Sequence, residues 1–177
     1  MPDTIISAEG AAPPPSLQPS LRWMLRDPAR VIALSAGVGL ARFAPGTFGT
    51  LAAFPLQWWI APHFSDRMWL GMLAGAFVLG IWACGRAGRA LGVADHGAIV
   101  WDETVAFLLV LFFTPGGRWW QLLAFALFRA FDIVKPPPIR YFDTRWKNGF
   151  GVMFDDLLAA FFTLLVMAVV RKWVTGL

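Results

Sequence analysis

Carboxylate side chains gather in the segment from Asp95 to Glu103, immediately before an apolar run. Asp95, Asp102 and Glu103 supply three carboxylates and His96 adds an imidazole, all within nine residues. If the segment is helical, Asp102 lies two turns after Asp95 on the same face, whereas a break at Gly97 would let Asp95 approach through a loop. Such a group can bind a cation or exchange protons. The alternatives are that the acids only complement the dipole of the following helix and that His96 is an ordinary polar residue.

A second set of charges combines both signs and leads into the last apolar run. Arg129, Asp132 and Lys135 recur at a spacing of three, which places them along one helix face until the following prolines end it. Asp155 and Asp156 follow a glycine-containing stretch. The structural alternatives are an Arg129–Asp132 ion pair with Lys135 extended toward a membrane interface, and a capping role for the two adjacent acids.

A glycine- and threonine-rich segment, Ala44–Thr50, reads Ala-Pro-Gly-Thr-Phe-Gly-Thr and runs into apolar sequence. Its glycines let the backbone approach an anion, and the hydroxyls of Thr47 and Thr50 can donate hydrogen bonds together with the free N–H groups of a following helix. No Walker lysine follows, so a nucleotide-binding P-loop is not indicated. The alternative is a simple turn in which Thr50 is an N-cap.

Together, these residue types are suited to hydrolysis of a phosphate ester. Carboxylate oxygens favour Mg²⁺ or a similar hard cation, which usually bridges to substrate phosphate. Arg129 and Lys135 can neutralise the remaining phosphate charge. The single cysteine, Cys84, does not form a Cys-x5-Arg motif, which excludes a cysteine-phosphatase mechanism. A metal-activated water is the first candidate nucleophile, and an aspartate is the second.

The elements that position these groups are expected to be helices in a membrane. Hydrophobic residues make up 58% of the chain, charged residues only 15%, and the mean hydropathy is +0.60, beyond the usual mix of a soluble domain. Met68–Gly85 is uncharged throughout and predicts a transmembrane helix. Phe43–Pro62, interrupted by prolines and glycines, predicts a loop feeding a short or re-entrant helix. Further apolar runs are Thr104–Thr114, Trp119–Phe128 and Leu157–Val170, the first two joined at a Pro-Gly-Gly break.

We therefore expect an all-α integral membrane bundle, with about four membrane-spanning or membrane-embedded helices and cytoplasmic motif loops. Residues 1–20 are expected to form a disordered polar tail and residues 21–177 a single helical domain. With four crossings, eleven of the fifteen lysines and arginines fall on one side, which the positive-inside rule assigns to the cytoplasm. Every acidic residue except Asp66 falls on that same side. The net charge of +4 favours anionic lipid over nucleic acid in so apolar a chain.

Four motifs, taken in order, resemble the phosphatidylglycerophosphatase A family. They are Pro-Gly-Thr-Phe-Gly-Thr at 45–50, Asp-His-Gly through Trp-Asp-Glu at 95–103, Phe-Arg-Ala-Phe-Asp-Ile-Val-Lys-Pro at 128–136 with Pro-Ile-Arg at 138–140, and Gly-Val-Met-Phe-Asp-Asp at 151–156. The similarity covers roughly residues 39–160. The sequence departs from the family pattern in the three prolines after Lys135, where an aromatic between two prolines is expected, and in Ala160, where glycine is common.

The resemblance implies a Mg²⁺-dependent phosphatase of the bacterial cytoplasmic membrane that converts phosphatidylglycerophosphate to phosphatidylglycerol. It also implies a multi-pass, mostly helical protein with the active site facing the cytoplasm and six site carboxylates. We expect the catalytic residues to be Asp95, His96, Asp102, Glu103 and Asp132, the phosphate-binding residues to be Thr47, Thr50, Arg129 and Lys135, and the metal ligands to be Asp102, Glu103, Asp132, Asp155 and Asp156. No nucleic acid and no obligate protein partner are indicated. The alternatives are a small membrane cation-binding or transport bundle, and a structural membrane subunit whose acids cap helices.

Overall fold

The computed structural model describes residues 17–176, and every regular element in that range is a helix. The all-α expectation is therefore confirmed for this part of the chain. The predicted tail, residues 1–20, lies outside the described residues apart from residues 17–20, which lead into the first helix.

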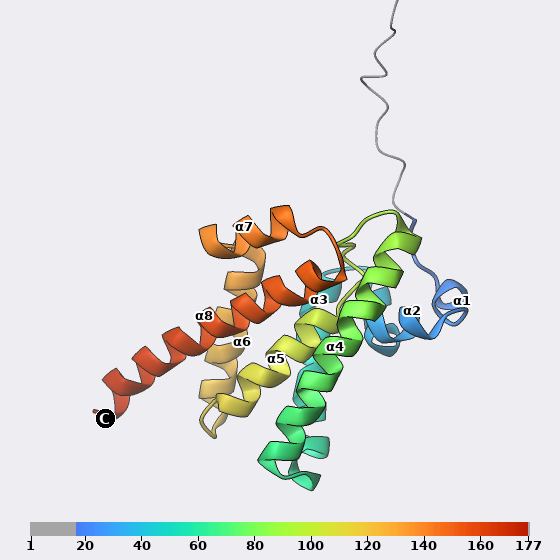
Figure 1. The fold of residues 1–177 in the computed structure, drawn as a ribbon. Helices are drawn as coiled ribbons and strands as arrows, with labels where there is room; N and C mark the ends of the chain where they lie inside the picture. The colour runs from blue at the N-terminus through green and yellow to red at the C-terminus, as the bar shows by residue number, and fades with distance from the viewer. Residues whose placement is uncertain (1–16, 177) are drawn as a thin grey trace, which may run out of the picture.

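Short helices come first along the chain, and longer helices follow, with one short helix before the last of them (Figure 1). In order, the elements are α1 (Leu21–Met24), α2 (Pro28–Ala33), the 3-10 segment η1 (Ser35–Leu40), α3 (Pro45–Pro55), the π-helical turn η2 (Leu56–Ile60), the 3-10 turn η3 (Ala61–His63), α4 (Asp66–Leu91), α5 (Trp101–Phe113), α6 (Arg118–Val134), α7 (Pro137–Arg145) and α8 (Gly149–Thr175).

Helix α4 contains the predicted transmembrane stretch and extends it at both ends. The Ser65 hydroxyl accepts a hydrogen bond from the Met68 N–H at 3.4 Å and caps the first turn. Gly92, with φ of 78°, ends the helix in the left-handed conformation. The helix has 26 residues, which is about 39 Å at 1.5 Å per residue.

Helix α8 begins about two turns before the apolar run from which it was predicted. Asn148 is the N-cap, and its side chain accepts a backbone N–H at 3.0 Å. The extension is possible because Gly149 lies against α4, where a Cβ atom would overlap the Ile81 carbonyl oxygen. Asp155 and Asp156 consequently lie well inside α8 and are buried, so the capping role considered for them is wrong.

Within residues 17–176, two helices are long and apolar enough to cross a membrane: α4, and the Gly149–Val174 part of α8. Helices α5 and α6 have 13 and 17 residues, or about 20 and 26 Å of helix, whereas a hydrocarbon core is about 30 Å thick. The break at Pro115–Gly117 forms the expected short connection between them. Length and composition thus support two of the expected crossings, and the bundle of four spanning helices is not confirmed.

The Gly/Thr segment forms the first turns of α3, whereas the sequence predicted a loop before the helix. α3 begins at Pro45, directly after Ala44 in the left-handed conformation with φ of 45°. Thr50 lies inside this helix, and its hydroxyl donates to the Gly46 carbonyl at 2.9 Å. The N-cap alternative for Thr50 is therefore wrong. The turns η2 and η3 then continue the chain to α4, in agreement with a short helix in this region.

Helix α5 lies at the centre of the bundle, and α8 runs from this centre out to the C-terminus (Figure 1). α5 packs against α3, α4, α6 and α8, and α8 also contacts α4, α6 and α7. Phe107 of α5 is fully buried, and its ring centroid lies 5.4 Å from that of Phe54 in α3 and 5.3 Å from that of Phe128 in α6. Because this packing fixes the rotation of α5, it also fixes where the acids of the first turn of α5 point.

Candidate active site

Three carboxylates meet between the first turn of α5 and the N-terminal part of α8. Asp102, Glu103 and Asp156, here named the Asp102 cluster, each offer one oxygen, and these oxygens lie within 4.8 Å of one another. Asp102 and Asp156 are only 5% and 3% exposed. One buried oxygen of each residue has no hydrogen-bond partner: Oδ1 of Asp102, Oε2 of Glu103 and Oδ2 of Asp156. Buried, unpartnered carboxylate oxygens at this spacing are suited to a cation.

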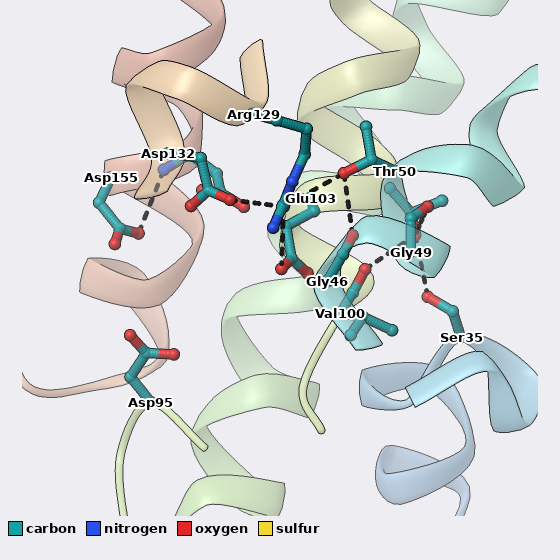
Figure 2. Close-up of polar contacts among 12 residues, drawn as sticks. Ser35, Gly46, Gly49, Thr50, Asp95, Val100, Glu103, Arg129, Asp132 and Asp155 are labelled. Carbon is teal, nitrogen blue, oxygen red and sulfur yellow. Dashed lines mark hydrogen bonds and ion pairs between the residues drawn. The ribbon is translucent and has the colours of Figure 1, made fainter. Parts of the chain in front are cut away.

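One guanidinium borders the Asp102 cluster, that of Arg129 in α6. Its Nη1 lies 2.5 Å from Oδ2 of Asp132 and 3.7 Å from Oε1 of Glu103. The same nitrogen donates to the Thr50 hydroxyl at 3.4 Å (Figure 2). The Arg129–Asp132 ion pair considered from the sequence is therefore present, and it also holds Arg129 against α3 and α5.

The N-terminus of α3 approaches this guanidinium because Gly46 carries no side chain. A Cβ atom on Gly46 would overlap Oε1 of Glu103 and would lie 3.2 Å from Nη1 of Arg129. Gly49 has a similar role one turn later, where a Cβ would lie 2.7 Å from Cβ of Val100. The two glycines thus let α3 and α5 pack closely beside the site.

Hydroxyl hydrogen bonds fix α3 against α5 on the side away from Arg129. The Thr104 hydroxyl lies 3.0 Å from the Gly49 carbonyl oxygen, 2.8 Å from that of Val100 and 3.1 Å from the Ser35 hydroxyl. Thr104 and Ser35 are both buried. This network sets the position of α3 relative to the acids in the first turn of α5.

A second group of three carboxylates surrounds one ammonium. Asp95, Asp143 and Asp155 offer oxygens within 4.8 Å of one another, and Nζ of Lys135 makes ion pairs with all three. The Nζ–oxygen distances are 2.9 Å to Asp143 and 3.6 Å to Asp95, and the contact with Asp155 is also direct. We name this group the Lys135 cluster. Lys135 therefore points into a polar site, where carboxylates from three elements surround its ammonium.

Asp95 and His96 belong to a loop, residues 92–100, between α4 and α5, so the loop alternative for Asp95 is the correct one. The ring Nδ1 of His96 accepts the Ala98 N–H at 3.1 Å. Both side chains line a polar cavity of about 600 Å³ that also includes Arg42 and Pro45. The cavity places His96 near the start of α3.

Burial and neighbouring charges shift the pKa values of these groups in different directions. Burial, followed by the Asp132 charge, raises the pKa of Glu103 to about 8, and burial and Glu103 raise that of Asp102. Burial alone would lower the pKa of Lys135, but its carboxylate partners outweigh this effect and raise it. Burial lowers the pKa of His96, which favours the neutral imidazole.

The fold thus divides the residues expected at one site between two adjacent clusters. Asp102, Glu103 and Asp156 form one, whereas Asp155 lies in the other and Asp132 is paired with Arg129. Thr50 contacts Arg129, but Thr47 makes no side-chain contact that ties it to either cluster. Sequence reasoning assigned no role to Asp143. The sequence around Asp143, a short polar segment after the prolines, does not show which acids lie near it in space. Asp143 reaches them because the turn at Lys135 brings α7 back over α8.

Comparisons with known proteins identify the relatives of this chain. A family model described as Phosphatidylglycerophosphatase A matches residues 31–171. The chain is 43% identical to Phosphatidylglycerophosphatase A of Haemophilus influenzae over 156 residues, which is 88% of this chain and 96% of the relative. It is 34% identical to the Escherichia coli protein of the same name over 139 residues, 78% of this chain and 80% of the relative.

A third relative has a different name. A Bacteroides thetaiotaomicron protein, provisionally named as a phosphatidylinositol-3-phosphatase, is 38% identical over 155 residues, 82% of this chain and 94% of the relative. No solved structure matches the chain with significant similarity. Because the family model covers most of the chain and two relatives that carry its name align over most of their length, the chain belongs to the phosphatidylglycerophosphatase A family.

Proposed function

We propose that this protein is a Mg²⁺-dependent phosphatase that hydrolyses phosphatidylglycerophosphate to phosphatidylglycerol and inorganic phosphate, at the cytoplasmic face of the bacterial inner membrane. The observation that carries the proposal is the Asp102 cluster, with three unpartnered carboxylate oxygens beside the Arg129 guanidinium. The names of the Haemophilus influenzae and Escherichia coli relatives supply the substrate.

The donor set of the Asp102 cluster suits Mg²⁺. All three ligands are carboxylate oxygens, which hard divalent cations prefer, and no histidine or cysteine belongs to the cluster. We propose Asp102, Glu103 and Asp156 as the ligands. This set is narrower than the sequence-based one, because Asp132 and Asp155 have cationic partners. A bound Mg²⁺ would act as a Lewis acid toward the phosphate and would lower the pKa of a coordinated water.

The residues next to the cluster can bind the phosphate and orient it. Arg129 can donate two parallel hydrogen bonds to phosphate oxygens, and Asp132 fixes its orientation from the same helix. At the start of α3, the N–H groups of Thr47 and Phe48 donate to the Ala44 carbonyl, and the Gly46 N–H is left to favour an anion. We propose that Thr47 and Thr50 complete this pocket. Because the Lys135 ammonium is surrounded by carboxylates, Arg129 is the principal phosphate-binding cation in this proposal.

The polar cavity beside the clusters can hold the headgroup and water. Asp95 is the one carboxylate among the described residues that line it, and 39% of its side chain is accessible, so it can accept a proton from an attacking water. Hydrolysis forms a bond from the water oxygen to phosphorus and breaks the bond from phosphorus to the lipid glycerol oxygen, which must gain a proton. His96 lines the same cavity and is the candidate donor to that leaving oxygen.

An apolar cavity beside α5 is suited to the acyl part of a lipid substrate. It measures about 330 Å³ and is lined by one face of α4 with residues of α5 and α8. Val105 and Ala106 in its wall follow Asp102 by three and four positions, and Leu157 follows Asp156 directly. A phosphate at the Asp102 cluster can therefore keep its acyl chains in the apolar region.

Phosphate release from phosphatidylglycerophosphate by the purified protein in detergent micelles tests the proposal. We expect release that requires Mg²⁺, stops with chelator and returns when Mg²⁺ is restored. Asp66→Asn, at the opposite end of α4, is the control and should leave the rate unchanged. No release from a folded, Mg²⁺-loaded sample would contradict the proposal, and cation flux in vesicles under those conditions would favour a transport bundle.

The Bacteroides thetaiotaomicron relative makes a second lipid phosphate worth testing. Its name refers to phosphatidylinositol 3-phosphate, which is also a phosphomonoester on a lipid headgroup. The same assay with that lipid distinguishes the two substrates. We expect faster release from phosphatidylglycerophosphate, because the two relatives named for it include the one at 43% identity.

A further inference from the structure

In both acidic clusters the carboxylate oxygens are close enough to share a metal ion, but the cationic side chains beside the two clusters differ. In each, three carboxylate oxygens lie within 4.8 Å of one another, close enough to share a metal ion. The described part of the chain therefore contains two sets of oxygens with metal-like spacing. Only the Lys135 cluster has an ammonium in ion-pair contact with all three of its carboxylates.

The backbone conformation at Lys135 directs its ammonium to a point between three elements. Lys135 ends α6 in the left-handed conformation, with φ of 44°, which is uncommon for a residue other than glycine. From there, its side chain meets Asp95 in the 92–100 loop, Asp143 in α7 and Asp155 in α8. Only 22% of the Lys135 side chain is exposed. The ammonium thus occupies the centre of the cluster and crosslinks the three elements.

The charge balance of the two clusters differs accordingly. In the Lys135 cluster, three carboxylates face Lys135, and Lys147 adds a second ammonium 3.4 Å from Asp143. In the Asp102 cluster, the nearest guanidinium lies 3.7 Å from Glu103 and already pairs with Asp132 at 2.5 Å. The Asp102 cluster also has the three unpartnered oxygens, whereas no oxygen of the Lys135 cluster is buried without a partner. A divalent ion is therefore favoured at the first cluster over the second, where the ammonium already lies among the carboxylates and offsets part of their charge.

We propose that the Lys135 ammonium takes the place of a second divalent cation, so that the protein binds one metal ion per chain, at the Asp102 cluster. This inference rests on the proposed metal dependence of the phosphatase. Lys135 is then a positioning residue. Its partner Asp155 accepts the Asp156 N–H at 3.1 Å through Oδ1, so the ammonium steadies the turn of α8 that presents Asp156 to the metal.

The number of bound Mn²⁺ ions per chain tests the proposal without relying on turnover. Mn²⁺ alone is titrated into purified full-length protein, and free Mn²⁺ is measured by electron paramagnetic resonance. We expect one ion for the wild type, none for Asp156→Asn, and one for Asp143→Asn. Lys135→Met removes the ammonium but keeps much of the side-chain length, so it should bind two ions. Lys135→Arg keeps the charge and should bind one.

Combining Lys135→Met with Asp143→Asn should return the count to one, because the added site loses a ligand. A wild-type count of two, with one ion lost in Asp143→Asn, would overturn the proposal, and so would a count of one in folded Lys135→Met. If Lys135→Met does not fold, the wild-type, Asp143→Asn and Asp156→Asn counts decide the matter. A wild type that binds none while Lys135→Met binds one would support the role of Lys135 and refute the proposed metal dependence.

Discussion

Replacement of Gly46 by alanine is expected to abolish most activity without unfolding the protein. The methyl group would overlap Oε1 of Glu103, and real Cβ atoms essentially never approach another atom within 3.0 Å. The Glu103 carboxylate must therefore withdraw by roughly 1 Å, a displacement that can reduce the rate about 100-fold when it affects a group that positions substrate or metal. The same methyl would lie 3.2 Å from Nη1 of Arg129 and would crowd the guanidinium that we propose binds phosphate.

Gly46→Ala should change the stability much less than the activity, because the atom that must move, Oε1 of Glu103, is at the end of a flexible side chain. Alanine also favours a helix over glycine by roughly 0.5–1 kcal/mol, which offsets part of the cost. We therefore expect a Tm within about 3 °C of the wild type. The control is Gly71→Ala in α4, where the methyl meets no atom within 4 Å. It should keep full activity.

Phosphate release and thermal unfolding of Gly46→Ala, Gly71→Ala and wild type, measured in the same detergent, check this prediction. The Mg²⁺ concentration that gives half-maximal activity should also rise in Gly46→Ala, and it should stay unchanged in Gly71→Ala. A Gly46→Ala enzyme with activity within threefold of the wild type would refute the assignment of Glu103 and Arg129 to the site. A collapse of Tm together with activity would show that Gly46 is needed for packing instead.

Three further substitutions test individual side chains by the same assays. Asp156→Asn should lower kcat at least about 100-fold. It should leave the Tm of the metal-free protein unchanged or higher, because it removes a buried charge. A large loss of stability would instead indicate a structural role for Asp156. Arg129→Lys should lower kcat/KM by about tenfold or more, because an ammonium cannot reproduce the paired donors of the guanidinium; an unchanged kcat/KM would exclude bidentate phosphate binding. His96→Asn keeps an acceptor for the Ala98 N–H. This substitution removes the proposed proton donor to the leaving oxygen, so we expect kcat to fall by about 100-fold, whereas a loss of only about threefold would exclude His96 as the general acid. Because burial lowers the pKa of His96, the wild-type rate should fall as the pH rises through that pKa, and this fall should be absent in His96→Asn.

The helical elements could be predicted because their causes are local. The uncharged stretch Met68–Gly85 is long enough to require a helix wherever it lies, and α4 contains it completely. The break at Pro115–Gly117 removes helix propensity and ends α5 where expected. The start of α8 could not be predicted, because it depends on a close approach of Gly149 to the α4 backbone that only packing reveals.

The family, and the residue types of its site, were likewise available from the sequence by itself. Four ordered motifs and their carboxylates indicate a phosphatase that uses a hard cation, because residue chemistry does not depend on the fold. Which acids share a cation depends on distances in space. In the fold, Asp132 forms an ion pair with Arg129, and Asp155 forms one with Lys135. The acids that remain close enough to share a cation are Asp102, Glu103 and Asp156.

The role of Lys135 shows most clearly what only the tertiary structure decided. In the sequence, the spacing of Lys135 from Arg129 predicted that both side chains lie on one helix face and bind phosphate together. In the fold, α6 ends at Lys135 in a left-handed turn, and the side chain leaves that face to meet carboxylates from a loop and two other helices. Local sequence specifies that a helix must end before prolines. Which distant charges surround the last side chain is set by the packing of α7 and α8, and no local pattern encodes it.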